Sequence, residues 1–258
     1  MTALLSVRGV SKRFGGMSVL TNAGLDVHAG SVQALIGPNG AGKTTLLNIV
    51  SGYLAGDTGN VTFRGRRVDG WSASRRVAAG MARTFQLVQL FGRMTVAENV
   101  VCGFHLHERH SLVGAMLRTR HFLAEERRLR RAADDLLDRL GLTSYAETAA
   151  ALLPFGLQRR LEVARALATQ PALLLLDEPC AGLSGPEVQE LGDVLRRLAA
   201  DGMGLLLVEH HMPFVLGLAD RVAVLDAGEI IAEGRPADIR TNSRVIEAYL
   251  GETAHAPA

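Results

Sequence analysis

The hydrophobic positions of this chain form several short continuous runs. They include VQALI at 32–36, LLLLD at 173–177, GLLLV at 204–208 and RVAVL at 221–225. A short run without polar alternation is typical of a strand that is buried on both faces of a parallel sheet. The pattern therefore predicts a buried parallel sheet, most of whose strands come from the second half of the chain.

Residues 95–150 follow a helical pattern instead. Their centre is the arginine-rich RTRHFLAEERRLRRAADDLLDRLGL at 118–142, which mixes charges of both signs and is typical of an exposed helix. LLPFGLQRRLEVARAL at 152–167 also has helical amphipathic spacing. Strands at 1–70, helices in the middle and strands again at 170–234 predict a helical subdomain inserted into an α/β core.

Composition narrows the picture only slightly. The 258 residues are 48% hydrophobic, which is typical of a globular protein. Their net charge of +2 is too small to imply a strong electrostatic attraction for nucleic acid. The two cysteines lack metal-ligand spacing, which favours reduced thiols in a reducing compartment. The N-terminus lacks the apolar core of a signal peptide, and no run of apolar residues is long enough to span a bilayer. We therefore expect a cytosolic protein.

The segment IGPNGAGKTT at 36–45 carries the strongest chemical signal. Gly37, Gly42, Lys43 and Thr44 fit the pattern G-x-x-x-x-G-K-[ST] between a predicted strand and a predicted helix. The glycines let backbone N–H groups surround phosphate oxygens, the lysine neutralises charge, and the Thr44 hydroxyl is suited to Mg²⁺. We expect the triphosphate of a nucleotide to bind Gly37, Pro38, Asn39, Gly40, Ala41, Gly42, Lys43, Thr44 and Thr45.

An acidic pair follows the strand LLLLD. Asp177 ends the strand, at the edge where open α/β sheets place their ligands, and Glu178 is next to it. Together with the phosphate-binding loop, Asp177 is predicted to bind Mg²⁺ through water. Glu178 is predicted to orient or deprotonate the water that attacks the γ-phosphate.

With these motifs in order, the chain resembles the ATP-binding subunit of an ABC transporter. RTFQ, LLPFGLQRR, LLLLDEP and LLLVEHH follow the phosphate-binding loop in the family's order, and the resemblance covers about residues 4–251. KRFGG, RTFQLVQLFGRMTVAENV and VIEAYLGE are similar to the larger ATPase subunit of branched-chain, or hydrophobic, amino acid importers.

The resemblance implies a fold class and a division of the chain. The fold is an α/β P-loop NTPase core of ABC-ATPase type, with an inserted helical subdomain and an N-terminal antiparallel β region. We expect the nucleotide-binding core at about 4–94 and 170–251, the helical subdomain with the signature at about 95–169, and a disordered tail at 252–258.

The resemblance also assigns residues one at a time. Phe14 matches the aromatic that stacks on adenine, with a core phenylalanine as the alternative, and Gln86 matches the loop glutamine that reaches Mg²⁺ or the attacking water. His210 matches the histidine that bonds the γ-phosphate, and we choose it over His211 because it follows LLLVE. Gly156 belongs to the signature, which in this family reads the ATP held by a second cassette.

Some positions depart from the family pattern. Pro154 and Leu157 replace the signature's usual Ser and Gln, and Ser184 stands where an Asp is common. We expect nucleotide binding to be intact and the signature to work but to be weakened. His105, His107 and His110 are close together and open a metal hypothesis; a solvated helical face is the preferred interpretation, since no cysteine or further acidic ligand accompanies them.

The function implied is that of an ATP-hydrolysing subunit of an import complex, with ATP and Mg²⁺ as cofactors. The implied partners are a second ATPase subunit, different or identical, two membrane-spanning permease subunits gripped near Gln86 and, indirectly, a periplasmic solute-binding protein. The chain would lie at the cytoplasmic face of the inner membrane, without a nucleic-acid partner. Two alternatives stay open: a soluble ABC-type ATP switch acting on nucleic acid, and import of urea or amides by the same machinery.

Overall fold

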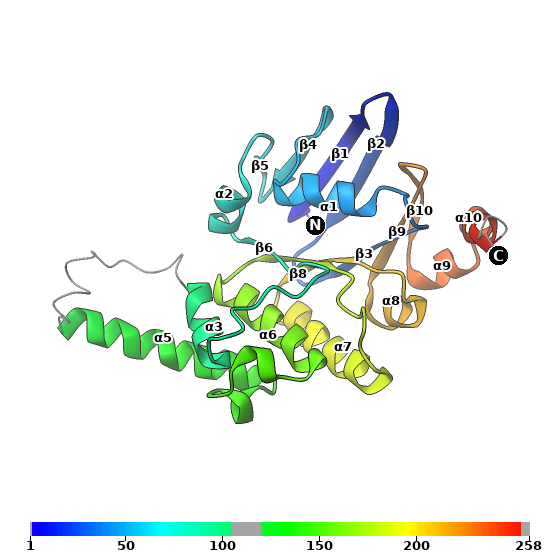
Figure 1. Cartoon of the computed structure of the whole chain (residues 1–258). Helices are drawn as coiled ribbons and strands as arrows, with labels where there is room; N and C mark the ends of the chain where they lie inside the picture. Colours follow the sequence, from blue (N-terminus) through cyan, green and yellow to red (C-terminus); the bar gives the residue numbers. More distant parts are fainter. Residues whose placement is uncertain (1, 105–119, 254–258) are drawn as a thin grey trace.

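Two β-sheets organise the computed structural model, which describes residues 2–104 and 120–253 (Figure 1). An antiparallel sheet has the strand order β2-β1-β4-β5, and a six-stranded sheet has the order β10-β9-β3-β8-β7-β6. The strands are β1 (Leu5–Phe14), β2 (Met17–Val27), β3 (Val32–Ile36), β4 (Thr58–Phe63), β5 (Arg66–Arg67), β6 (Met81–Arg83), β7 (Leu173–Asp177), β8 (Gly204–Val208), β9 (Arg221–Asp226) and β10 (Glu229–Gly234).

The six-stranded sheet is parallel from β9 to β6, and only β10 pairs in the antiparallel direction. Its central strands β3, β7 and β8 are buried at every position. Successive leucines of β7 contribute to different cores: Leu174 and Leu176 to one, Leu173 and Leu175 to another. The prediction of parallel strands buried on both faces is therefore confirmed.

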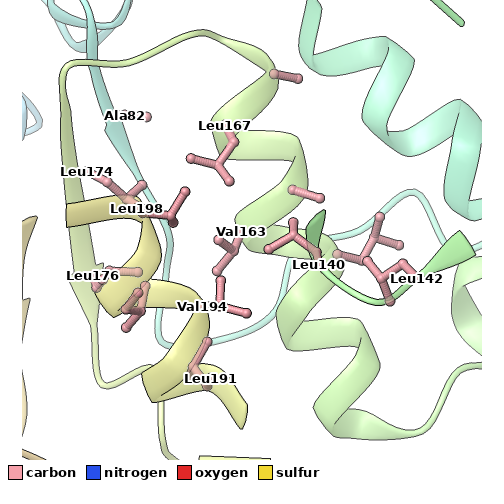
Figure 2. Close-up of a cluster of buried hydrophobic side chains, with 14 of the residues drawn as sticks. Ala82, Leu140, Leu142, Val163, Leu167, Leu174, Leu176, Leu191, Val194 and Leu198 are labelled. Carbon is pink, nitrogen blue, oxygen red and sulfur yellow. The ribbon is translucent and has the colours of Figure 1, made fainter. Parts of the chain in front are cut away.

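Helices cover both faces of this sheet. The helix α1 lies between the two sheets, where Leu46 and Leu47 join the core they share, while α6 and α7 cover the opposite face (Figure 1). Figure 2 shows Val163 and Leu167 of α6 gathered with Leu191 and Leu198 of α7 near β7. The helices are α1 (Lys43–Ser51), α2 (Ala73–Ala78), α3 (Val96–Gly103), α5 (Arg120–Arg139), α6 (Phe155–Ala168), α7 (Gly185–Ala200), α8 (Met212–Leu218), α9 (Pro236–Arg240) and α10 (Ser243–Thr253).

The helical segment between β6 and β7 contains α3, α5 and α6. Thr95 starts α3 with a reciprocal capping box to Glu98, a local signal that fixes where the helix begins. In α5 the four arginines at 127, 128, 130 and 131 are exposed while Leu129 is buried, as an exposed amphipathic helix requires. Within the described ranges, no helix is both long and apolar enough to cross a membrane.

Two expectations, the disordered tail and the histidine cluster, fall partly or wholly outside the described residues. Residues 252 and 253, which we assigned to a disordered tail, instead continue α10. The reason is that α10 has an apolar face: Val245 is buried, and Tyr249 packs against the same cluster. The rest of the tail, and His105, His107 and His110, lie outside the described residues.

Candidate nucleotide and metal site

The loop between β3 and α1 has the backbone geometry that phosphate binding needs. Gly37, Gly40 and Gly42 have positive φ angles of 150°, 78° and 103°. A Cβ at Gly37 would lie 1.9 Å from the carbonyl oxygen of Leu225, so only glycine fits there. The loop leads directly into α1, whose first N–H groups have no partner within the helix and favour an anion.

Lys43 is the first residue of α1, and its side chain reaches back over this loop. Its Nζ donates to the carbonyl oxygens of Gly37 at 2.7 Å and Pro38 at 2.8 Å. The residue is only 7% exposed, whereas Thr44 beside it is exposed. The ammonium group is thus held above the curled loop, and the Thr44 hydroxyl is accessible at the start of the helix.

Glu178, Gln86 and His210 come from three loops that meet at the end of β7. Gln86 Nε2 donates to Glu178 Oε2 at 2.9 Å, and His210 Nδ1 lies 3.7 Å from Glu178 Oε1. Glu178 is held in the left-handed region at a φ of 45°, with its N–H bonded to the carbonyl oxygen of Val208 at 2.9 Å. The structure therefore brings together the three side chains for which we predicted catalytic roles.

Asp177 is 5% exposed at the last position of β7. Its Oδ2 accepts from Arg83 at 2.9 Å. Among the described residues, no group of three or more His, Cys, Asp or Glu could hold a metal ion. A carboxylate and a hydroxyl fit Mg²⁺, which proteins usually hold through one or two carboxylates together with phosphate oxygens of the substrate.

Sequence reasoning missed Glu209, which shapes the same edge of the sheet. Its carboxylate is 1% exposed and accepts the backbone N–H groups of Cys180, His210 and His211 at 2.9–3.1 Å. It thereby ties the loop after β8 to the loop after β7. Burial beside Glu209 also raises the pKa of the Cys180 thiol far above its usual range, so the thiol stays protonated.

A buried ion pair of α6 holds the segment around Gln86. Arg159 donates to the carbonyl oxygens of Phe85 and Gln86 at 2.8 Å, and Glu162 accepts the N–H of Phe85 at 3.1 Å. Arg159 and Glu162 also bond each other at 3.1 Å, with side chains 2% and 3% exposed. The helix that carries the signature is therefore fastened to the glutamine loop.

The start of α6 differs from a simple open helix end. Pro154 is the N-cap residue and supplies no side-chain bond, and Leu157 packs against the core. The carboxylate of Glu187 in α7 lies against Gly156, with Oε1 2.2 Å from where a Cβ of Gly156 would be, and Ser184 bonds this carboxylate through its N–H and hydroxyl at 2.8 and 2.6 Å. These bonds lower the pKa of Glu187, the Ser184 hydroxyl most of all, so the helix start already faces an anionic group.

Phe14 ends β1 and is 49% exposed, and Lys12 Nζ lies 5.6 Å from the ring centroid. Phe14 is therefore not a core phenylalanine, and that alternative to adenine stacking is wrong. The exposed face of the ring is free of the protein core and suited to stacking on a base.

Comparison with known proteins gives consistent matches. The family model described as ABC transporter matches residues 20–181, and the model described as branched-chain amino acid ATP-binding cassette transporter matches residues 229–255. The high-affinity branched-chain amino acid transport ATP-binding protein LivG of Salmonella typhimurium is 42% identical over 251 residues, which cover 96% of this chain and 98% of LivG. BraF of Pseudomonas aeruginosa, which carries the same description, is 37% identical over 250 residues, 96% of this chain and 98% of BraF.

Solved structures give the same result for the fold. An ATP-binding cassette of an ABC transporter in its ADP conformation has a TM-score of 0.85 at 30% identity, and covers 97% of this chain and 100% of that chain. A nucleotide-free cassette has a TM-score of 0.83 at 30% identity, and covers 96% and 99%.

Proposed function

Because this chain belongs to the ATP-binding cassette family of ABC transporters and is an ATPase, we propose that it powers the import of branched-chain or other hydrophobic amino acids. The observation that carries the solute class is the end-to-end similarity to LivG, together with the family segment at 229–255. The relatives favour neither a switch on nucleic acid nor urea or amide import.

In this proposal, the phosphate-binding loop and Lys43 hold the β- and γ-phosphates of ATP. The loop supplies N–H groups and Lys43 supplies charge, after its Nζ exchanges the carbonyl oxygens of Gly37 and Pro38 for phosphate oxygens. Thr44, Asp177 and Gln86 would hold Mg²⁺, and Phe14 would stack on the adenine. Mg²⁺, when bound, neutralises charge on the phosphates.

Glu178 is proposed to take the proton of the attacking water. Gln86 and His210 face its two carboxylate oxygens, so the side chain is oriented from both sides. His210 is 60% exposed at its side chain, which leaves its imidazole accessible to the γ-phosphate. Gln86 would orient the water beside Glu178.

We propose that each complete site needs a second cassette, whose signature reads the γ-phosphate. Gly156 fits this role because an anionic group, the carboxylate of Glu187, already lies against it at the helix start. Phosphate oxygens carry the same sign of charge, so an incoming γ-phosphate would replace Glu187 at the helix start. Pro154 offers no hydroxyl here, which would weaken the closed state.

The Gly156→Asp variant is expected to abolish ATP-driven dimerisation in a Glu178→Gln background. A Cβ at Gly156 would lie 2.2 Å from Glu187 Oε1, and a second carboxylate would repel the phosphate. Pro154→Ser should instead tighten dimerisation. Dimer fraction against ATP concentration, measured by sizing with light scattering, checks both.

The control for this series is Gly217→Asp, at an exposed position of α8 where a Cβ meets no atom within 4 Å. It should dimerise like its parent. A Gly156→Asp chain that dimerises equally well would reduce this segment to an ordinary helix start.

The partners are proposed to be a second, different ATPase subunit, two permease subunits and, indirectly, a periplasmic solute-binding protein, with the cassette at the cytoplasmic face of the inner membrane. A groove beside the Gln86 segment supports the permease contact. It is lined by Phe85, Phe91, Cys102 and Arg165, among others, and is mostly apolar. Nucleic acid is not among the proposed partners.

The decisive experiment reconstitutes the complex in lipid nanodiscs. The chain alone should hydrolyse ATP slowly, because it lacks the second signature. ATPase activity should rise when the permeases, the second cassette and the binding protein with leucine are present, and urea should not replace leucine. Full, concentration-independent turnover by the isolated monomer would refute the shared site, and stimulation by urea alone would refute the solute class.

A further inference from the structure

Arg83 lies at the junction of three elements beside the nucleotide site. It is the last residue of β6, and its side chain is 7% exposed. One terminal nitrogen donates to Asp177 Oδ2 at 2.9 Å, and the other donates to Asn48 Oδ1 and Ser51 Oγ of α1, each at 2.7 Å. The guanidinium group thus joins the end of β7 to the helix that begins with Lys43.

Two aromatic rings hold the guanidinium group in place. The Arg83 Cζ lies 5.1 Å from the ring centroid of Phe85 and 5.6 Å from that of Tyr53. The two rings also contact each other edge to face, with centroids 5.6 Å apart. The Arg83 Nε is buried without a hydrogen-bond partner, so the bonds of this side chain point only toward Asp177 and α1.

The positions of the groups that Arg83 bonds indicate that this side chain has a role beyond packing. Asp177 and Thr44, the proposed metal-binding side chains, come from different elements, and Arg83 links β7, which ends with Asp177, to α1, which carries Thr44 at its second position. A planar fork of donors fixes direction as well as charge. Only one oxygen of Asp177 is used by Arg83.

We propose that Arg83 is the positioning residue of the metal site, which holds Asp177 at a fixed place and orientation relative to α1. The inference rests on the proposed role of Asp177. In this proposal Arg83 acts through Asp177 and is not itself a ligand of the metal. Outer partners of metal-binding carboxylates typically change metal affinity by 10–100-fold when they are removed.

The test separates metal-dependent from metal-independent binding of ATP by the full chain. The Kd of a fluorescent ATP analogue is measured in Mg²⁺ and in EDTA, and the ratio of the two reports how strongly the metal supports binding. Arg83→Ala should lower this ratio by about tenfold while the Kd in EDTA stays within about twofold of the parent. A merely structural residue would weaken binding equally in both conditions, and that outcome would overturn the proposal.

Two milder variants keep the test valid if Arg83→Ala fails to fold. Arg83→Lys retains a cation for Asp177 but not the fork, so it should give an intermediate ratio. Asn48→Ala removes an anchor on α1 and should lower the ratio as well. Arg221→Ala is the matched control: this arginine starts β9 of the same sheet and pairs with Glu233 at 3.3 Å, and its loss should leave the ratio unchanged.

Asp177→Asn separates a failure of the positioning role of Arg83 from a failure of the metal role of Asp177. It should lower the ratio, and Arg83→Ala should lower it no further in the double variant, because both changes remove one function. If Asp177→Asn lowers the ratio and Arg83→Ala and Arg83→Lys do not, the inference fails while the metal site stands. If Asp177→Asn has no effect, the metal role of Asp177 fails, and the inference with it.

Discussion

Glu178→Gln is expected to slow ATP hydrolysis by about 10²–10⁴-fold in the assembled complex, the usual contribution of a positioned base. Binding of ATP should persist, because a glutamine of the same shape can still accept from Gln86 Nε2. Single-turnover hydrolysis and the Kd for ATP, measured on the same preparation, separate the two effects.

Two further variants are needed to interpret the result for Glu178→Gln. Glu229→Gln, at an exposed position of β10, should hydrolyse ATP normally. Lys43→Ala should weaken ATP binding itself, because it removes the only lysine of the phosphate-binding loop. A Glu178→Gln complex that turns over at the parental rate would remove Glu178 from the role of base.

Arg159→Leu is expected to lower the free energy of unfolding by about 3–5 kcal/mol, because it leaves the carboxylate of Glu162 buried without its charged partner. The bonds from Arg159 to Phe85 and Gln86 are lost at the same time. Urea unfolding, followed by circular dichroism, measures the loss.

The effect of Arg159→Leu should depend on pH. Desolvation raises the pKa of Glu162, opposed by the Phe85 N–H and by Arg159, so removing Arg159 raises the pKa further. A carboxyl group with a raised pKa in the folded state contributes its stability at low pH and loses it as pH rises through that pKa. The stability difference between the variant and its parent should therefore be larger at pH 8 than at pH 5.

The double variant Arg159→Leu/Glu162→Leu controls for the buried charge. It should recover much of the stability, since it removes the buried carboxylate that Arg159→Leu leaves without its closest charged partner. ATPase activity in the complex should be lowered in the single and the double variant alike, because both release the Gln86 segment from α6. Equal stability of Arg159→Leu and its parent across this pH range would mean that the pair contributes little to the fold.

The family, the fold and the ATPase activity could be predicted from the sequence because their signals are local. A run such as LLLLD indicates a buried strand without reference to the rest of the chain. The spacing of Gly37, Gly42 and Lys43 indicates a phosphate-binding loop in the same way. The parallel pairing of β7 with β8 confirms the predicted parallel sheet, and the comparisons confirm the family. The roles of individual site residues stay predictions.

The connecting residues could not be predicted, for a physical reason. Arg83 and Glu209 work through partners far away in the chain, and a single arginine or glutamate in a sequence carries no mark of its partner. The close approach of Glu187 to Gly156 was missed for the same reason. The periodicity of α6 revealed its buried side, but not that the side contained an ion pair.

The left-handed backbone of Glu178 has a consequence for how this protein responds to selection. A non-glycine residue in that region costs on the order of 1 kcal/mol, and glycine would adopt the φ of 45° without that cost. Selection for heat resistance alone would therefore favour glycine at the position that the reaction reserves for a carboxylate. Thermostability and turnover are opposed at this single residue, and engineering toward greater thermostability should keep it fixed.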